Sequence, residues 1–220
     1  LWEKRTTAFE PTTYKETKQQ VYQQAAGLIK LGVAAGTKIA LLSEGRNAWI
    51  IGELAILHTG AVNVPLSIKL EESNDLIFRL KHSECEYIFV SGTQLKKIRA
   101  IVGDLPLVKK VIVFDEQTDF QPQEMGMKEL ISMGNTYLKE NPNCVTERAN
   151  AVKPDDLANI SYTSGTTADP KGIMLTHRNY TANVEQALTL MDIPQTYRTL
   201  IILPLDHCFA HVAGFYSFMA

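Results

Sequence analysis

The 220-residue sequence lacks the features that mark several large classes of protein. It has three cysteines, Cys85, Cys144 and Cys208, which are odd in number, widely spaced and not arranged as a C-x-x-C pair. This usage argues against a disulfide framework and predicts a reducing, cytoplasmic compartment. No apolar run is long enough to cross a bilayer, which argues against a membrane-spanning helix. The formal net charge of −2 gives no indication of a nucleic-acid-binding surface.

The composition is that of an ordinary globular protein, with 45% hydrophobic and 21% charged residues. The length allows one large domain or two small ones. A polar stretch over residues 146–156 separates two parts of the chain. We therefore expect a first α/β subdomain over residues 1–150 and the start of a second, incomplete one over residues 151–220.

Apolar runs alternate with helical patterns along the chain. Helical spacing predicts helices over residues 13–31, 48–58, 71–81, 94–101, 125–140 and 177–190. Short apolar runs predict strands over residues 38–42, 62–64, 87–90, 111–114, 157–160, 173–175 and 199–203. Thr13 and Glu16 fit a capping box, and Thr176 fits a helix cap. This alternation predicts an α/β fold, a mostly parallel sheet with helices on both faces, which binds ligands at the carboxyl ends of its strands.

The densest group of small and polar residues lies at 162–172 and reads Y-T-S-G-T-T-A-D-P-K-G. Small residues let the backbone approach a ligand, and their amides and hydroxyls can ring an anion. Lysine adds a compact positive charge of the kind that binds phosphate. The alternative is a Ser/Thr-rich surface turn, because such residues are common in turns for local reasons. Their density and order favour a loop that binds the phosphates of a nucleotide.

Two familiar nucleotide motifs do not fit this loop. Counting from Gly165, Pro170 stands where the second glycine of a Walker loop belongs, and proline has no N–H to donate. Gly172 follows Lys171 in place of the Ser or Thr that would hold magnesium. The G-x-G-x-x-G fingerprint of dinucleotide-binding folds is also absent. The loop therefore has another design.

The segment resembles the phosphate-binding signature of the adenylate-forming superfamily, which includes acyl-CoA synthetases, aryl-CoA ligases, adenylation domains and luciferases. It departs from the family pattern at Ala168, where glycine is usual, and the added methyl group predicts a stiffer loop. Three further stretches are similar to long-chain fatty acid–CoA ligases. They are I-M-L-T-H-R-N at 173–179, R-N-A-W at 46–49 with A-V-N-V-P-L at 61–66, and L-P-L-D-H-C-F at 203–209.

The resemblance implies the amino-terminal part of the large domain of an ATP-dependent acid–thiol ligase (AMP-forming). Its partners would be a fatty acid, ATP and coenzyme A, with Mg²⁺ held by residues outside this chain. The resemblance assigns His207 a place beside the α-phosphate and the acyl carboxylate; the alternative is a structural histidine at a strand end. Lys171 would balance phosphate charge. The resemblance assigns phosphate binding to Thr163, Ser164, Gly165, Thr166, Thr167 and Lys171.

Several motifs of the family have no counterpart in these 220 residues. They are the Tyr-Gly-x-Thr-Glu segment with its magnesium-binding glutamate, the ribose-binding Thr-Gly-Asp motif and the lysine of the small C-terminal domain. We therefore expect the isolated chain to be inactive. Its last residues, 215–220, are mostly apolar and predict an unfinished helix that leads the fragment to self-associate. The resemblance leaves open whether the full-length enzyme also makes a peripheral membrane contact.

Three other interpretations remain. Within the same chemistry, the chain could belong to an aryl-acid or short-chain-acid CoA ligase, or to an amino-acid adenylation domain. In a different class, it would be a stand-alone nucleotide-binding module. His207 and His211 stand four residues apart, but a catalytic zinc site usually needs a third protein ligand, and no H-E-x-x-H glutamate is present. We assign no metal ligand and interpret His211 as a helix-surface or core histidine.

Overall fold

The computed structural model describes residues 1–4, 7–163, 170–194 and 196–220. Within these residues, seven strands form one sheet in the order β7-β6-β5-β3-β4-β8-β9. All neighbouring strands run parallel except β8 and β9, which are antiparallel. The strands are β3 (Lys38–Leu42), β4 (Val62–Pro65), β5 (Tyr87–Val90), β6 (Lys110–Val113), β7 (Glu124–Gly126), β8 (Leu157–Tyr162) and β9 (Gly172–Thr176). A separate hairpin is formed by β1 (Trp2–Lys4) and β2 (Phe9–Pro11).

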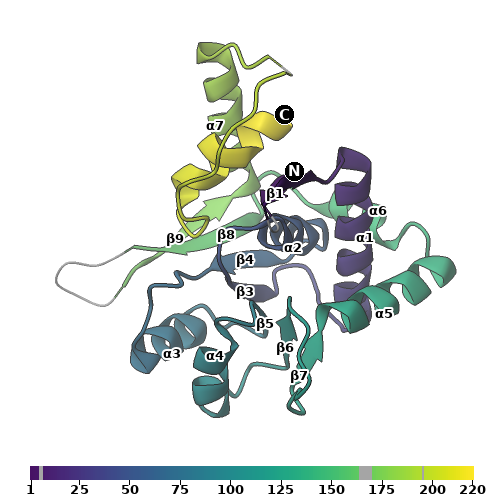
Figure 1. The fold of residues 1–220 in the computed structure, drawn as a ribbon, viewed down its shortest axis with the longest axis vertical. Coiled ribbons are helices and arrows are strands. Elements are labelled where there is room, and N and C mark those ends of the chain that lie inside the picture. The colour runs from purple at the N-terminus through teal and green to yellow at the C-terminus, as the bar shows by residue number, and fades with distance from the viewer. Residues whose placement is uncertain (5–6, 164–169, 195) are drawn as a thin grey trace.

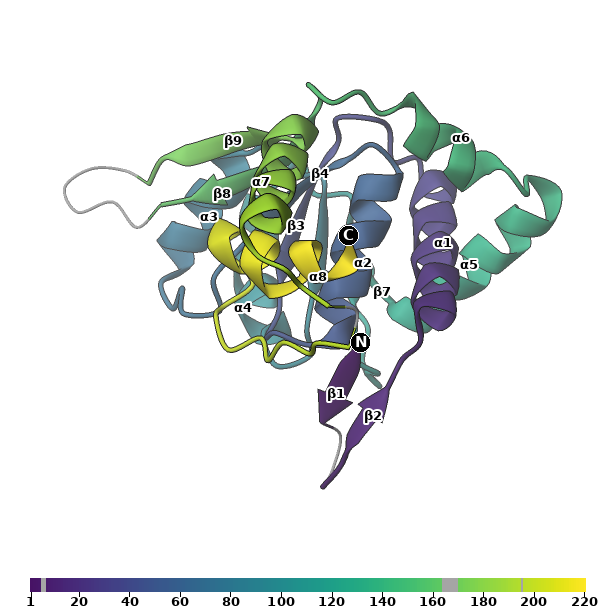
Figure 2. The ribbon, with the colours of Figure 1, turned by 90° about the horizontal axis from the view of Figure 1, so that it is seen from above.

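Helices cover both faces of the sheet, so the predicted fold class is confirmed (Figure 1). One face carries α3 (Ser73–His82) and α4 (Leu95–Ile101), which η1 (Val102–Asp104) follows. The other face carries α1 (Tyr14–Lys30), α2 (Asn47–His58), α5 (Met127–Glu140) and α6 (Cys144–Ala151). Seen from above, α7 (His177–Leu190), the π-helix η2 (Ala210–Tyr216) and α8 (Ser217–Met219) lie over the β4–α2 region (Figure 2).

Strand β3 shows how the sequence divides the core between the two faces. Ala40 and Leu42 pack into the cluster beneath α3 and α4, whereas Ile39 and Leu41 pack against α2. Successive side chains of a strand point to opposite faces, so a run of apolar residues is buried on both sides. The apolar run K-I-A-L-L therefore predicts a central parallel strand, and it is one.

Helix α1 begins and ends where its sequence indicates. The Thr13 hydroxyl accepts a hydrogen bond from the Glu16 amide at 3.2 Å, and the Glu16 carboxylate accepts one from the Thr13 amide at 2.8 Å. The predicted capping box is thus confirmed. Beyond the helix, Gly32 has a φ of +92°, a value that favours glycine.

Helices α1 and α5 cross at two glycines. A Cβ atom on Gly134 would lie 1.9 Å from the carbonyl oxygen of Gln23, and one on Gly27 would lie 2.4 Å from that of Leu130. No side chain can be accommodated at such a distance, so glycine at both positions permits the close approach of the two helix backbones. This contact holds α5 against α1 on the outer face of the molecule.

Two elements differ from the helix predictions. Residues 124–126 form strand β7, which pairs with β6, so the helix predicted from residue 125 begins at Met127. Helix α6 extends into the polar stretch that we interpreted as a boundary, because the fully buried Val145 anchors it against α1 and α2. Strand β4 pairs with β8 at Asn63 and Asn159, so one sheet continues across residue 150. The division at residue 150 stays a prediction.

The strand predicted over residues 199–203 is wrong. This stretch has no regular secondary structure, and the side chains of Leu200 and Ile202 are 71% and 81% exposed. A strand needs a neighbour to satisfy its backbone groups, and β9 rather than this segment continues the sheet beyond β8. Only Ile201 packs onto the core cluster around α2. Among the helices that the structure describes, none is both long and apolar enough to cross a membrane.

Candidate functional site

The β8–β9 hairpin brings two of the predicted phosphate-binding residues together. The Thr163 amide donates a hydrogen bond to the Lys171 carbonyl at 3.1 Å, directly after the pair Tyr162–Gly172. Both residues are exposed. Thr163 follows the carboxyl end of a parallel strand, where α/β sheets place their ligand sites. The other four predicted residues, Ser164, Gly165, Thr166 and Thr167, lie outside the described residues.

Tyr162 anchors this end of β8 to α3. Its hydroxyl lies 3.2 Å from the Arg79 carbonyl and 2.8 Å from Nδ1 of His82. A carbonyl can only accept, so the Tyr162 hydroxyl donates to Arg79 and accepts from an Nδ1–H of His82. Burial raises the pKa of Tyr162, which keeps the phenol protonated. The aromatic residue that opens the signature thus fixes the start of the loop.

Gly172 makes the other side of the hairpin compatible with that anchor. A Cβ atom here would lie 3.0 Å from Cγ2 of Ile160 and 3.4 Å from the ring of Tyr162. A larger residue would push β9 away from β8, and with it the adjoining Lys171. The glycine that ends the signature is therefore explained by close packing between the two strands.

The far end of the hairpin is joined to α7 by the turn at residues 153–156. The amide of His177 donates to Asp156 O at 3.1 Å, and that of Arg178 donates to Pro154 O at 2.7 Å. The Arg178 guanidinium also forms two hydrogen bonds with the Asp155 carboxylate, at 2.7 and 3.0 Å. Thr176 caps α7 in a capping box with Asn179, which confirms the predicted cap.

His207 is exposed and follows a buried anchor. Leu205 is 3% exposed and packs into the core cluster around Trp49. The His207 carbonyl accepts from the Ala210 amide at 2.8 Å, and its Nδ1 accepts from the Phe209 amide at 3.3 Å. Because residues 199–203 are not a strand, His207 does not stand at a strand end as predicted. It projects from a turn that leads into a helical segment.

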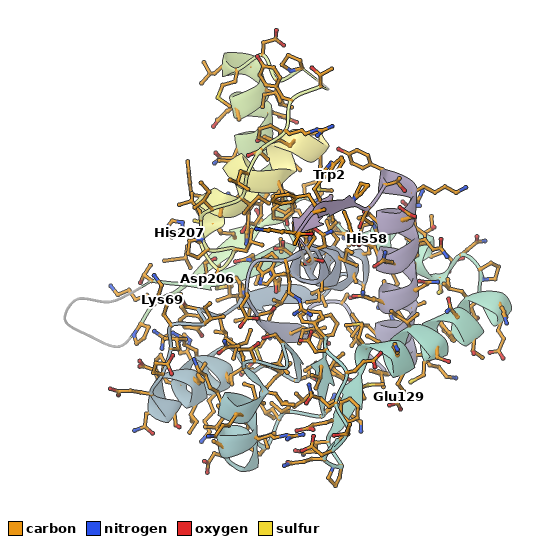
Figure 3. The ribbon with its side chains drawn as sticks, viewed as in Figure 1. Trp2, His58, Lys69, Glu129, Asp206 and His207 are labelled. Carbon is orange, nitrogen blue, oxygen red and sulfur yellow. The ribbon has the colours of Figure 1, made fainter. Side chains whose placement is uncertain are left out.

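The structure leaves His207 without a direct link to the loop base. Among the described residues, no hydrogen bond or ion pair joins it to Thr163 or Lys171. Figure 3 shows Asp206 and His207 on the flank of the molecule from which the β8–β9 hairpin extends. The two candidate segments thus share a side of the protein without touching through polar contacts.

A buried polar cluster between α2, β4, α7 and η2 was not predicted. Glu53 and His211 are 1% and 0% exposed. Glu53 Oε1 lies 3.0 Å from Asn63 Nδ2 and 3.6 Å from His211 Nδ1, and the Tyr180 hydroxyl lies 3.1 Å from that same Nδ1. Burial raises the pKa of Glu53, although the hydrogen bond from Asn63 opposes the shift. His211 is a core histidine, one of the two alternatives that we favoured.

One sequence signal points to this cluster. Glu53 is the single charged residue in the helix N-A-W-I-I-G-E-L-A-I-L-H, apart from the terminal histidine. A helix that is apolar all round is buried on all sides, so its lone carboxyl needs a buried partner. The partner cannot be read from the sequence. Within the described part of the chain, no three His, Cys, Asp or Glu side chains gather as a metal site.

The sequence matches the family of AMP-binding enzymes over residues 4–220. The chain belongs to this family. A chloroplastic long-chain-fatty-acid–acyl-carrier-protein ligase of Arabidopsis thaliana is 29% identical over 216 residues, which cover 94% of this chain and 30% of that protein. A propanoyl:CoA ligase of Mycobacterium tuberculosis, whose acid carries a methyl-dioxo-octahydroindenyl group, is 32% identical over 92% of this chain and 39% of its own length.

This AMP-binding chain also has the fold of solved ligases. An anthranilate CoA ligase in complex with anthranoyl-AMP superposes with a TM-score of 0.82 at 23% identity, over 95% of this chain and 38% of that one. A long-chain-fatty-acid–CoA ligase of Archaeoglobus fulgidus superposes with a TM-score of 0.79 at 20% identity, over 99% of this chain and 40% of that one. At these identities the likeness shows the fold alone. The chain spans about a third of the length of its curated relatives.

Proposed function

We propose that the protein containing this chain is an ATP-dependent acid–thiol ligase (AMP-forming) that acts on long-chain fatty acids. The observation that carries the proposal is the base of the β8–β9 hairpin. There Thr163 and Lys171, near the two ends of the phosphate signature, are joined by a backbone hydrogen bond at the carboxyl end of β8. Membership of the AMP-binding family supports it, as do relatives named as long-chain fatty acid ligases.

The reaction runs in two steps. A carboxylate oxygen attacks the α-phosphorus of ATP, and the bond to pyrophosphate breaks to give an acyl-adenylate. A thiol sulfur then attacks the acyl carbonyl, and AMP leaves. Positioning and neutralisation of phosphate charge supply most of the catalysis in such transfers. Within this chain, Lys171 balances the charge of the phosphates, the signature's amides and hydroxyls hold them, and His207 lies beside the reacting carboxylate.

Magnesium is usual in such chemistry, and the resemblance places its ligand outside this chain. Among the described residues, no three acidic, histidine or cysteine side chains come together. We therefore assign no magnesium ligand in this chain and derive no step from the metal. Coenzyme A is the proposed thiol; the acyl-carrier-protein ligase among the relatives makes a carrier-protein thiol the alternative acceptor.

The class of acid is the part of this proposal to test first, because a relative that is 32% identical is named for a ring-bearing propanoate rather than a fatty acid. Acid-dependent ATP–pyrophosphate exchange, measured on the natural protein that contains these residues, separates the candidates. We expect saturation with C12–C18 fatty acids and none with aromatic acids, short acids or amino acids. Exchange driven only by one of those other acids would move the assignment to that class. ATP binding without exchange for any acid would identify a nucleotide-binding module.

The hairpin base is tested by Lys171→Met in the same protein. Loss of a charge-assisted contact with phosphate should lower kcat/KM for ATP about 10- to 100-fold. Lys153→Met is the matched control, because Lys153 is also exposed and lies in the turn before β8 rather than at the loop. Equal kinetics of the two variants would exclude Lys171 from phosphate binding.

The 220-residue chain by itself is expected to be inactive, because the family's magnesium, ribose and C-terminal lysine motifs are not among its residues. Exposed Leu190, Leu200 and Ile202 add to the expectation that it self-associates. Robust exchange by the isolated chain, or a clean monomer in light scattering at high concentration, would overturn the respective expectation.

A further inference from the structure

The turn that carries His207 is tied to the core by a second histidine. Nε2 of His211 lies 2.5 Å from the carbonyl oxygen of Leu205. Because a carbonyl only accepts, Nε2 carries the hydrogen in this contact. In the neutral ring Nδ1 is then the acceptor, and the Tyr180 hydroxyl, 3.1 Å away, donates to it. The two ring nitrogens thus have distinct roles.

The ring itself is also packed by residues of α2 and of its own helix, η2. Trp49 of α2 packs against it with ring centroids 5.3 Å apart, and Phe215 and Tyr216 of η2 lie at 5.9 and 6.0 Å. The Glu53 carboxyl lies 3.6 Å from Nδ1 and is itself bound by Asn63. Since His211 is fully buried among these groups, its Nε2–H has a fixed direction.

The direction of His207 depends on that bond. Its side chain is exposed, and its only hydrogen bond among the described residues comes from the Phe209 amide of its own turn. Within the described part of the chain, no hydrogen bond from outside the turn holds the imidazole, so its place follows the backbone of residues 204–207. That backbone is held by the Leu205 side chain in the core and by the Leu205 carbonyl on His211.

We propose that His211 is a positioning residue for His207: its Nε2–H holds the Leu205 carbonyl and thereby sets the turn from which His207 faces the reacting carboxylate. The inference rests on the proposed ligase function. Reacting groups must be held to within a fraction of an ångström, so a small displacement of the turn is costly to the rate.

Two substitutions separate the hydrogen bond from mere packing. In His211→Gln the amide nitrogen reaches the place of Nε2 and still donates to Leu205. In His211→Asn it reaches only the place of Nδ1, so the carbonyl is left unpaired. In the natural protein, we expect His211→Asn to lower kcat for acyl-adenylate formation about tenfold or more. We expect His211→Gln to lower it less than about threefold, and neither should change KM for ATP much.

The matched control is the same pair of substitutions at His58. Its Nδ1 also bonds a backbone carbonyl, Leu54 O at 2.7 Å, but on α2 beside α1. Both His58 variants should keep the wild-type kcat. Melting temperatures are recorded for all four variants. The His211→Asn and His211→Gln proteins should have melting temperatures within a few degrees of each other. A kcat loss that merely follows the melting temperature in both would show a structural role and refute positioning.

A spectroscopic readout keeps the test independent of turnover. With ¹⁵N-histidine labelling, His211 should show the Nε2–H tautomer, and the His207 signals should shift in the Asn variant but not in the Gln variant. An Nδ1–H tautomer would overturn the proposal, as would an active His211→Asn protein with wild-type kcat. If the tautomer is found but no acid drives exchange in the wild type, the proposed function fails and the catalytic role of the bond fails with it.

Discussion

Glu53 Oε1 accepts a hydrogen bond from Asn63 Nδ2 at 3.0 Å and so links α2 to β4 inside the core. Burial raises the pKa of this carboxyl above its ordinary value of 4.5, while the hydrogen bond from Asn63 acts in the opposite direction. The native state therefore binds the Glu53 proton more tightly than the unfolded chain does.

Glu53→Gln should change the pH dependence of stability. Between 4.5 and the raised native pKa, the native protein holds more protons than the unfolded chain, so wild-type stability falls as the pH rises. Glutamine does not titrate. The free energy of unfolding of the variant relative to wild type should thus increase with pH, by at most about 1.4 kcal/mol per pH unit. Urea unfolding from pH 4.5 to 8 measures this difference. The exposed Glu140→Gln is the control, and a difference that falls with rising pH would contradict the prediction.

The ion pair between Arg99 and Glu124 is expected to make stability depend on pH in the opposite direction. The Arg99 guanidinium donates to both carboxylate oxygens of Glu124, at 2.7 and 2.8 Å, and this pairing lowers the pKa of Glu124 below 4.5 in spite of burial. The stabilisation is present above pH 4.5 and is lost as the pH falls through the lowered native pKa. Arg99→Met should therefore be less stable than wild type at pH 7, and the gap should narrow on acidification.

The control for that pair is Lys96→Met, on the same helix α4 and exposed. It also removes one positive charge but leaves Glu124 paired. Thermal unfolding at pH 7 and in steps down to pH 3 compares the two variants. If Arg99→Met is as stable as Lys96→Met at pH 7, the ion pair does not contribute to stability.

The close crossing of α1 and α5 predicts that Gly134 does not tolerate a larger residue. Gly134→Ala places a methyl group 1.9 Å from Gln23 O, so the helices must separate, at a cost of about 1–3 kcal/mol or more. Gly103→Ala, where nothing lies within 4 Å, should change stability by less than about 1 kcal/mol. Urea unfolding of the two variants measures the difference in their stability. Equal stabilities would show that the two helices can move apart at no cost.

Features that depend on neighbouring residues could be predicted from the sequence. Both capping boxes, at Thr13 and Thr176, were partly or fully visible because each joins residues three apart. The apolar run of β3 predicted a central strand for a similar reason, since its length and composition suit burial on both faces. The tightly ordered signature at 162–172 likewise pointed to the family, which the match over residues 4–220 confirms.

Features that depend on a distant partner could not. Residues 199–203 have the composition of a strand, but no strand of the sheet pairs with them in the described part of the chain, so they stay irregular. The short strand β7 was missed because only its pairing with β6 makes it a strand. His211 was visible as a residue four after His207, but its bond to Leu205 depends on how η2 packs against α2 and α7.

The sequence alone therefore determined the fold class, the caps of α1 and α7, and the two strands on either side of the phosphate signature, because these follow from local composition, spacing and contacts between near neighbours. Only the tertiary structure decided that Glu53 is buried beside His211 and that His207 stands on a turn rather than at a strand end. Burial and pairing are properties of two surfaces that meet, and one segment of sequence specifies only its own surface.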